Sequence, residues 1–441
     1  MLQQISITGL NHEGDGVGRT EEGKVVFIPF ALPREKISCN LTLEKKRWCK
    51  GELQEILSPS PHRIEPLCAT YYQCGGCSLQ HLEYKEQVKW KRGKVRQNLS
   101  RLGGLQQLEV LPLLSADNIF GYRNKLTLHY AQIKEKENAL GFFSPGTRSL
   151  VPVDNCLLAS SLMNDAIKLL SKILQDLPPK EIKKTMNKEI VLRQSFSRQE
   201  LLLLFRYFRE DSEKLEKISH LLKEKQPALT SAWQELPGKN ERPACKPLAG
   251  KEKLFEELLG KNFYLGPSTF FQVNKAQAQV LYQKVLELLE PVSPAGTLVD
   301  IHCGAGLMTL LTASMAQKVI GIESFPPAVE DARYNAQINN ISNATFLEGA
   351  AEKHLPQLLK KKKEIPDLAL LNPPRVGCSP SLLRTINNSK IPHLIYVSCD
   401  PATLARDLRI LINGGYRPGP VQPLDMFPQT SHVESIVALE K

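Results

Sequence analysis

The stretch VSCDPATLARD, residues 397–407, places a cysteine thiol where reactive groups are often found. The preceding run IPHLIY predicts a buried strand, and LARDLRILINGG predicts a helix that opens just after the turn. Cys399 is therefore expected at the carboxyl end of a strand, the edge of an α/β sheet at which ligands bind. A thiol in this position is a candidate nucleophile, and the turn that opens the helix could lower its pKa. The alternative is a buried, unreactive cysteine.

A carboxylate near the C-terminus is the second candidate for chemistry. The segment HVESIVALE predicts a last strand, and Glu434 stands among apolar residues near its start. A desolvated carboxylate of this kind can act as a general base. The alternative is a glutamate on the solvent side of an edge strand, which is the more common arrangement.

A glycine-rich turn followed by an acid predicts a cofactor site. The turn DIHCGAG, from Asp300 to Gly306, ends a predicted strand, and its glycines let the backbone approach a ligand closely. Glu323 ends the next predicted strand, where an acid can accept hydrogen bonds from ribose hydroxyls. The turn lacks the usual dinucleotide spacing, and D-x-x-C-G-x-G with a second-strand acid looks like the S-adenosylmethionine-binding version of this fold. An NAD enzyme or a plain tight turn is the alternative.

A further turn, LLNPPRVG at 370–377, ends another predicted strand at the same edge. By itself the Asn372-Pro-Pro sequence resembles the motif of methyltransferases that modify exocyclic amines. Those enzymes carry Tyr or Phe where this chain has Arg375, so the difference argues against methylation of an amine.

Three cysteines gather in one short stretch, Cys68-x5-Cys74-x2-Cys77, and the sequence holds ten in all. In a reducing cytosol such a group indicates a metal site or catalysis rather than disulfides. Three clustered thiols with a distant fourth fit a four-iron four-sulfur cluster, for which Cys156 in VPVDNC is the best fourth ligand. A zinc site, which usually uses two CxxC pairs, is the alternative.

These side chains need a sheet whose strands end at a common edge. After Asn262 helices and strands alternate, which predicts a doubly wound, mostly parallel α/β sheet over residues 263–441. Residues 58–262 mix helices with strands and predict a central α+β region. Residues 1–57 hold β-rich runs broken by glycine and proline, which predict a small β-barrel.

Basic residues dominate two N-terminal stretches and the chain as a whole, whose formal net charge is +11. In the barrel, residues 45–50 place four basic residues around a tryptophan, a pattern that suits single-stranded RNA, with a solvated strand as the alternative. The predicted helix that follows carries seven basic residues between Lys85 and Arg101 against one acid, which favours contact with phosphates.

The composition indicates a soluble globular protein, since 42% of the residues are hydrophobic. No apolar run approaches the roughly 18 residues of a membrane-spanning helix, and the first residues lack the features of a signal peptide. We therefore expect a cytoplasmic protein with no membrane partner. The sequence indicates no obligate protein partner.

Five motifs, SCDPATLARD, FPQTSHVES, FFQVN, DIHCGAG and CGGC, together resemble those of the RNA uracil-C5 methyltransferases. The chain looks most like the 23S ribosomal RNA branch, which has an OB-like TRAM barrel at the N-terminus and an iron–sulfur cluster. The resemblance runs from GDGVGR and VFIPFALPRE to the final strand. It implies RNA as the partner and S-adenosylmethionine as the methyl donor.

The resemblance also implies a mechanism. Cys399 attacks C6 of uracil, and this addition turns C5 into a carbon nucleophile that can take the methyl group. Glu434 then removes the C5 proton so that Cys399 can leave. The target base must leave its stack to reach the thiol, which is easiest in single-stranded or loop RNA.

The remaining binding roles are also carried over by resemblance. The residues assigned to the methyl donor or its pocket are Gln272, Asp300, Gly304, Gly306, Glu323 and Asn372. Asn372 replaces the family's usual aspartate, which keeps hydrogen bonding and loses the charge. The residues assigned to the 4Fe-4S cluster are Cys68, Cys74, Cys77 and Cys156. Arg123 in GYRNK matches a family position near the flipped base.

Three other interpretations remain open. The first is methylation of a different nucleobase, or the same chemistry on transfer RNA. The second is a non-catalytic module that binds RNA and the methyl donor, which only Asn372 favours. The third is a redox sensor in which a labile cluster gates RNA binding. We expect the cluster to be mainly structural, because it would join the 68–77 loop to Cys156.

Overall fold

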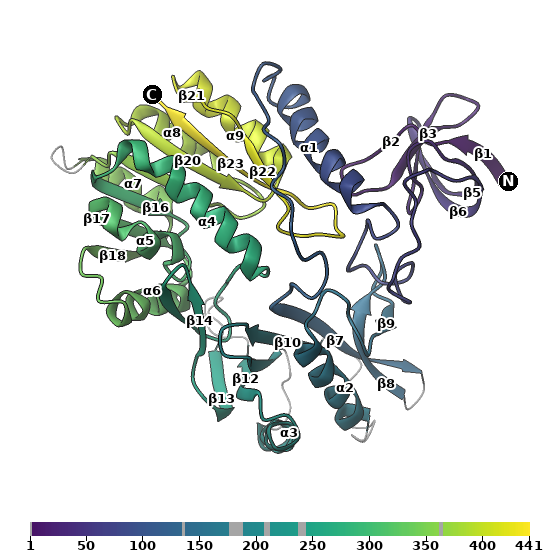
Figure 1. The fold of residues 1–441 in the computed structure, drawn as a ribbon, viewed down its shortest axis with the longest axis horizontal. Coiled ribbons are helices and arrows are strands. Elements are labelled where there is room, and N and C mark those ends of the chain that lie inside the picture. The colour runs from purple at the N-terminus through teal and green to yellow at the C-terminus, as the bar shows by residue number, and fades with distance from the viewer. Residues whose placement is uncertain (1, 135–136, 176–187, 207–211, 237–243, 361–364) are drawn as a thin grey trace.

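The computed structural model describes residues 2–134, 137–175, 188–206, 212–236, 244–360 and 365–441 (Figure 1). Within these residues the chain forms three large sheets and one two-stranded hairpin. No helix in the described part of the chain is both long and apolar enough to cross a membrane.

The N-terminal sheet is the expected small, curled barrel. Its six strands follow the order β1-β5-β6-β4-β3-β2. Buried apolar side chains, among them Ile5, Val26 and Ile37, form its core. The strands are β1 Leu2–Ser6, β2 Gly9–Leu10, β3 Gly16–Arg19, β4 Val25–Ile28, β5 Lys36–Glu44 and β6 Trp48–Ser58.

The central sheet has seven strands in the order β13-β12-β11-β10-β7-β8-β9, with two helices packed against it. The expected α+β character is confirmed, including the hairpin of β10 and β11 between the two helices. The elements are β7 Lys125–Lys134, β8 Glu137–Phe143, β9 Leu150–Pro152, α2 Ser161–Gln175, β10 Lys188–Ser195, β11 Glu200–Arg206, α3 Ser212–Lys225, β12 Leu229–Leu236 and β13 Ala244–Gly250. A separate hairpin follows, formed by β14 Leu254–Leu258 and β15 Lys261–Leu265.

The C-terminal sheet is doubly wound, in the order β18-β17-β16-β19-β20-β23-β21, and β22 pairs with β23. The strands from β16 to β20 are parallel, whereas β23 runs antiparallel to β20. The strands are β16 Ala295–Ile301, β17 Ala316–Glu323, β18 Ala344–Glu348, β19 Leu368–Leu371, β20 His393–Ser398, β21 Arg417–Pro418, β22 Gln422–Leu424 and β23 Glu434–Glu440.

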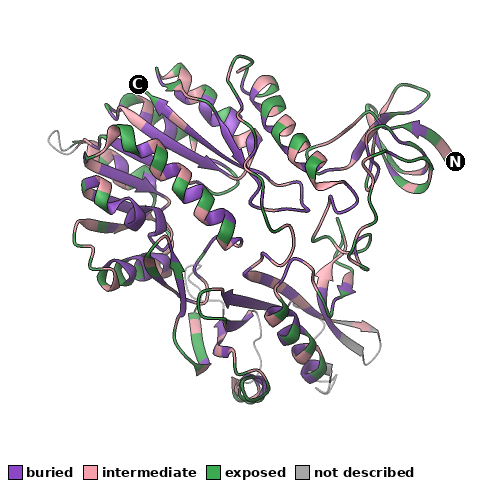
Figure 2. Cartoon of the chain, viewed as in Figure 1, coloured by how far each residue is buried: buried purple, intermediate pink, exposed green. Residues whose placement is uncertain are grey.

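Helices cover both faces of the C-terminal sheet, as Figure 1 shows. The helices and 3-10 turns are α4 Lys275–Leu289, η3 Glu290–Val292, α5 Leu307–Leu311, η4 Ala313–Met315, α6 Pro326–Ile338, α7 Ala351–Lys360, α8 Pro380–Asn388 and α9 Pro401–Asn413. One apolar core joins α4, α5 and α6 to the sheet, and a second core joins α7, α8 and α9 to it. The strands between the two cores are buried on both faces (Figure 2), as their continuous apolar sequence requires.

Helix α1, Tyr84–Arg101, packs against α9 of the C-terminal sheet although some 300 residues separate them. Val95 and Leu99 on α1 belong to the same core as Leu404 and Leu408 on α9. The basic helix is thereby fixed to the part of the chain that carries Cys399.

Candidate active site

Strand register brings the two predicted catalytic residues together. β20 and β23 pair in antiparallel fashion, with Ser398 opposite Ser435 as the last pair of the ladder. The next position along the same register places Cys399 opposite Glu434. Glu434 is buried and lies on a strand enclosed by β20 on one side and by β21 and β22 on the other, so it is not a solvent-facing edge residue.

The motif after Cys399 builds the turn that presents the thiol. Asp400 caps α9, because its side chain accepts hydrogen bonds from the backbone N–H groups of Ala402 and Thr403, both at 2.9 Å. Pro401 occupies the first helical position, where its missing N–H is harmless. Ser398 Oγ donates to the Asp400 carbonyl at 3.0 Å and closes the turn. The thiol therefore stands on a turn fixed from both sides.

The same motif also holds the loop of Arg375. The buried carboxylate of Asp407 accepts from the Cys378 backbone N–H at 2.8 Å, and Arg406 Nη2 donates to the Val376 carbonyl at 2.9 Å. Gly377 has a φ of 75°, and a side chain there would collide with Arg406. These contacts keep the residues next to Arg375 in one conformation.

Charges around Cys399 and Glu434 decide their protonation. The pKa of the Cys399 thiol is raised to about 11. Burial is the main cause of this shift; nearby Glu434 adds to it, and Arg375 opposes it. Burial also raises the pKa of Glu434 to about 7, and Arg375 again opposes the shift. The prediction that the helix-opening turn lowers the thiol pKa is wrong for this structure, because burial beside a carboxylate outweighs the turn. Asp400, not Cys399, occupies the helix cap.

Arg375 is a candidate functional residue to which the sequence reasoning gave no role. Its Nη2 donates to Nε2 of His432 at 3.2 Å. Burial lowers the pKa of His432 to about 4, and the Arg375 charge lowers it further, so the ring accepts this bond in its neutral form. The signal in the sequence was present, since Arg375 follows the strand-end motif Asn372-Pro-Pro at the same edge as Cys399.

A cavity lies at the ends of β16 and β19 and contains most of the predicted donor site. Gln272, Asp300, Gly304 and Asn372 line it. Glu323 stands directly behind the cavity, where its Oε2 accepts from the Gly304 backbone N–H at 3.0 Å. Gly306 does not line the cavity itself, although its neighbours Ala305 and Leu307 do. Its left-handed backbone (φ 81°) starts α5, and a side chain there would press on Ala332 and Phe346.

Asp300 carries the most unusual polar group of this cavity. Its Oδ2 accepts from the Thr309 hydroxyl at 2.6 Å, whereas its Oδ1 is buried and finds no partner among the described residues. Burial raises the pKa of Asp300 to about 7, and the charge of Glu323 raises it further. A buried carboxylate oxygen without a partner is costly unless a ligand supplies a donor or a cation.

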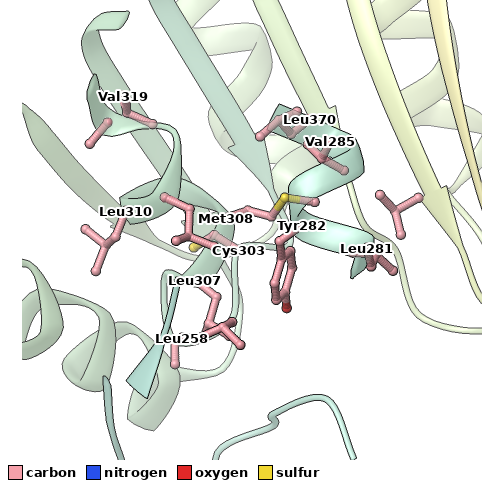
Figure 3. Close-up of a cluster of buried hydrophobic side chains, with 14 of the residues drawn as sticks. Leu258, Leu281, Tyr282, Val285, Cys303, Leu307, Met308, Leu310, Val319 and Leu370 are labelled. Carbon is pink, nitrogen blue, oxygen red and sulfur yellow. The ribbon is translucent and has the colours of Figure 1, made fainter. Parts of the chain in front are cut away.

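Six apolar side chains belong to both the donor cavity and the core beneath it, among them Tyr282, Cys303 and Met308. Figure 3 shows these three within this core. Burial raises the pKa of Tyr282, and so do the charges of both Asp300 and Glu434, so this ring lies within reach of the cavity and of the candidate base.

His302 and Phe270 also line the donor cavity, and neither was predicted. His302 has a φ of 65°, a conformation that residues other than glycine rarely adopt and that often marks a functional site. Phe270 is 61% exposed although it is a large apolar residue. The motifs DIHCGAG and FFQVN contained both residues, but no property of the sequence revealed their backbone strain or exposure.

The segment Asp425–Val433, which leads into Glu434, is held from α1 and from the cysteine loop. Lys91 Nζ on α1 lies 2.6 Å from Asp425 Oδ1, and both side chains are fully buried. Tyr84 Oη donates to the other Asp425 oxygen at 3.1 Å. The carbonyl of Gln429 accepts from the backbone N–H groups of Ser78 and Leu79, both at 3.0 Å. The candidate base therefore follows a segment that is anchored at its start and at its middle.

The four predicted cluster cysteines line one cavity of about 320 Å³; they are Cys68, Cys74, Cys77 and Cys156. Burial raises the pKa of Cys77 to about 12 and also raises that of Cys156. Gly75 docks the loop on β8 through a backbone hydrogen bond to the Phe143 carbonyl at 2.9 Å. Among the residues that the structure describes, no group of three or more His, Cys, Asp or Glu side chains could hold a metal ion.

Arg123 lies at the cysteine cavity. Its charge lowers the pKa of Cys77 and Cys156, and its Nε is buried without a partner in the described part of the chain. The next residue, Asn124, donates from Nδ2 to the Gln272 carbonyl at 2.8 Å. Gln272 lines the donor cavity and Val273 lines the cysteine cavity, so the FFQVN segment separates the two.

Comparison with known proteins agrees with this geometry. The family described as tRNA (uracil-5-)-methyltransferase matches residues 83–441, and the TRAM domain matches residues 2–53. The chain belongs to the tRNA (uracil-5-)-methyltransferase family. Similar proteins include an uncharacterized RNA methyltransferase of Caldanaerobacter subterraneus, 35% identical over 99% of this chain and 98% of the relative. Another, from Clostridium tetani, is 34% identical over 99% of this chain and 95% of the relative.

A solved structure resembles this methyltransferase along its whole length. It is a tRNA (uracil-54, C5)-methyltransferase of Pyrococcus abyssi in complex with S-adenosyl-L-homocysteine. It is 27% identical, has a TM-score of 0.77, and the match covers 99% of this chain and all of that one. The likeness confirms the expected fold, a doubly wound methyltransferase sheet with an N-terminal TRAM barrel.

Proposed function

We propose that this methyltransferase transfers a methyl group from S-adenosylmethionine to C5 of uracil in RNA, with Cys399 as nucleophile and Glu434 as base. The observation that carries the proposal is the pairing of Ser398 with Ser435, which leaves Cys399 and Glu434 as the next residues on the two chains, close enough for the charge of Glu434 to raise the pKa of the thiol. Tyr282 relates this pair to the donor cavity, because it lines the cavity and the charge of Glu434 raises its pKa.

Each residue has one step in the proposed reaction. The Cys399 sulfur bonds to C6 of uracil, the C5–C6 double bond opens, and C5 gains nucleophilic character. C5 would then attack the methyl group of S-adenosylmethionine, whose methyl–sulfur bond breaks as S-adenosylhomocysteine leaves. The Glu434 carboxylate removes the C5 proton, the C6–sulfur bond breaks, and the double bond returns. The charge of Arg375 favours the thiolate of Cys399 and the carboxylate of Glu434.

The donor cavity has the chemistry that a positively charged donor needs. The unpartnered Oδ1 of Asp300 could accept from the donor's ammonium group, and Glu323 stands at the end of β17, where ribose hydroxyls bind in this fold. The enclosed part of the cavity is only about 40 Å³, so a bound donor would extend past it along the exposed ring of Phe270. Gln272 and Asn372 line the same cavity and would contact the bound donor.

Two variants test the mechanism with RNA and labelled S-adenosylmethionine. Cys399→Ala should form no product and no covalent complex. Glu434→Gln should still add to uracil and transfer the methyl group, but it cannot remove the C5 proton. We therefore expect Glu434→Gln to accumulate a protein–RNA complex that carries the label and resists denaturant. Full turnover by either variant would contradict the proposed roles.

For the substrate, we propose 23S ribosomal RNA first. The support is the resemblance to the branch with a TRAM barrel and a cysteine group. In this proposal the predicted domains 1–57 and 58–262 bind the RNA, and domain 263–441 methylates it. Transfer RNA is the second candidate, favoured by the full-length similarity to the Pyrococcus abyssi enzyme, whose substrate is a tRNA. Incubation with each unmodified RNA, followed by digestion and identification of 5-methyluridine, separates the two.

We also propose that Cys68, Cys74, Cys77 and Cys156 hold a 4Fe-4S cluster. The support is a shared cavity lined by all four thiols, together with N–H groups that favour sulfur anions, such as Gly76 N–H on Cys74 Sγ at 3.4 Å. A single zinc ion fits less well, because the described side chains do not converge on one ion. When bound, the cluster would cross-link the 68–77 loop to the segment that precedes α2.

Anaerobic purification tests the cluster. We expect about four iron and four sulfide per chain, and lower soluble yield for Cys74→Ser. Stoichiometric zinc without sulfide would contradict the proposal. A well-folded, fully active Cys74→Ser protein would contradict the structural role.

A further inference from the structure

One flank of α1 carries a line of exposed cations that the proposed reaction does not use. Lys85, Lys89, Arg92 and Arg96 are all exposed, and their spacing of four, three and four residues places them on one side of the helix. Gln87, Lys91, Val95 and Leu99 form the buried side. The cationic stripe therefore follows the helix for about 16 Å, at 1.5 Å per residue.

The stripe borders a groove that the chain itself builds. The segment 106–110 runs beside α1, and together they enclose about 450 Å³. Arg92 donates from Nε and Nη2 to the Val110 carbonyl at 3.2 and 2.7 Å, which fixes the guanidinium at the groove without neutralising its charge. Lys89 and Arg96 line the groove as well, and Glu109 is the one acid among the lining residues. Lys89 Nζ also lies 2.5 Å from Glu86 Oε1 on the same helix, an exposed ion pair that a phosphate would have to replace.

Gly93 in the groove wall is an independent observation. Glycine in a helix interior is destabilising relative to alanine, so it usually has a structural reason. The two usual reasons are a left-handed backbone and a close neighbouring atom. Gly93 shows neither, because its backbone is helical and a methyl group at this position would meet no atom outside the helix's own backbone within 4 Å. Without a side chain at Gly93, a molecule bound in the groove can approach the helix backbone closely.

The groove is separate from the two sites described above. None of its lining residues lines the donor cavity or the cysteine cavity. Another flank of α1 faces the TRAM barrel, since Lys94 Nζ donates to the His12 carbonyl at 2.7 Å. A chain bound in the groove would thus lie along α1 without entering the crevice of Cys399.

We propose that this groove binds the sugar–phosphate backbone of a part of the RNA substrate remote from the reacting uracil. The inference rests on the proposed function for its choice of RNA. Lys89 and Arg96 pair with phosphates, Arg92 adds a third cation, and Gly93 admits the backbone close to the helix. Contacts of this kind add affinity without reading sequence.

The test measures binding of a long unmodified ribosomal RNA transcript to full-length protein at several salt concentrations. The variant Lys89→Gln/Arg96→Gln should bind about tenfold more weakly, and the slope of log affinity against log salt should fall by about one to two. The matched control is Lys353→Gln/Lys360→Gln on α7, which removes two exposed cations at the same spacing. Equal losses in the two variants would reduce the effect to net charge and overturn the proposal.

Gly93 supplies a test that keeps every charge. Gly93→Ala and Gly93→Gln should leave the midpoint of thermal unfolding unchanged or higher, because the helix improves. Both should weaken binding of the long RNA, and the longer Gln side chain should weaken it more. Unchanged affinity of Gly93→Gln for the long RNA would overturn the proposal. The finding that an acidic protein binds in the groove and RNA does not would also overturn it.

Methylation separates this proposal from the proposed function. The variant Lys89→Gln/Arg96→Gln should methylate the shortest hairpin that the wild type accepts, and its kcat/KM for that hairpin should equal that of the wild type. It should lose activity only on the long RNA at low RNA concentration. If the wild type methylates no RNA, the proposed function fails, while the binding comparison still decides whether the groove holds RNA.

Discussion

Asp425 and Glu434 lie nine residues apart, both buried, and the protein treats their carboxylates in opposite ways. Asp425 has the buried Lys91 Nζ at 2.6 Å, a tyrosine hydroxyl at 3.1 Å and a backbone N–H from Phe427 at 3.2 Å. Burial lowers the pKa of Lys91, and the charge of Asp425 opposes that shift. Glu434 has no hydrogen bond to its carboxylate within the described residues, and burial raises its pKa to about 7.

The difference shows how one segment combines rigidity with reactivity. A buried carboxylate with several hydrogen-bond partners anchors the chain, whereas one without partners can exchange a proton near neutral pH. The anchor at Asp425 holds the segment in place, so Glu434 can remain unpaired beside Cys399. Each prediction below removes or adds one charge of this system.

The largest effect should come from the anchor. Lys91→Met leaves Asp425 buried without its cation, which should lower the free energy of unfolding by about 3–5 kcal/mol. Urea denaturation measures the change. Lys89→Met on the exposed side of the same helix is the control and should change stability by less than about 0.5 kcal/mol.

The double variant Lys91→Met/Asp425→Leu sharpens this prediction. It removes both charges, so it should recover most of the stability that Lys91→Met loses. If Lys91→Met alone costs less than about 1 kcal/mol, the buried pair is not an anchor and the comparison with Glu434 fails.

Glu434→Gln should have the opposite effect on stability. The folded-state pKa of about 7 lies above the ordinary value of 4.5, so the wild type holds the proton more tightly when folded and loses stability as pH rises from about 4.5 to 7. Glutamine cannot ionise, so the variant should be more stable than the wild type above pH 7, on the order of 2–3 kcal/mol.

Unfolding midpoints of wild type and Glu434→Gln, measured from pH 5 to 8.5, check this. The two proteins should converge toward pH 5 and diverge toward pH 8. A difference that does not change with pH would show that Glu434 is not held in a raised-pKa state. Asp425→Asn, tested in parallel, should be less stable than the wild type at neutral pH.

The sequence predicted the reactive groups better than their surroundings. Strand ends located Cys399, and once β23 is placed antiparallel to β20, register alone brings Glu434 opposite the thiol. The shared cavity of the four cysteines followed from their spacing and the family resemblance. The spacing of apolar residues and the helix and strand propensities act locally. This is why the alternation of helices and strands along the C-terminal part of the chain was predictable.

What the sequence could not predict depends on contacts between distant segments. Lys91 and Asp425 are more than 300 residues apart, and neither shows any local sign of being buried. The pKa of Cys399 rises because tertiary packing buries the thiol beside Glu434, an effect larger than the local turn. Arg123 was predicted near the flipped base, whereas the structure places it at the cysteine cavity; its contact with RNA stays a prediction.

A smaller effect is expected from Arg375, whose charge opposes both raised pKa values. Arg375→Gln should shift the midpoint of the pH–rate profile upward and lower the rate at pH 7 about tenfold at low salt. Because Arg375 is exposed, added salt should shrink the difference between wild type and variant. Arg375→Lys, which keeps the charge, should retain the wild-type midpoint; an unchanged midpoint in Arg375→Gln would show that Arg375 does not act on the pair.

The smallest effect concerns Asn372, which shares the donor cavity with the uncompensated carboxylate of Asp300. Asn372→Asp adds an anion there, which should raise the pKa of Asp300 further and attract a cation. We expect the Kd for S-adenosylmethionine to fall about three- to tenfold above pH 7. Calorimetry with S-adenosylhomocysteine is the control, since that molecule lacks the sulfonium charge and should gain less. Equal gains for both ligands would assign the effect to hydrogen bonding, and no gain for either would place the added charge beyond reach of the donor's cation.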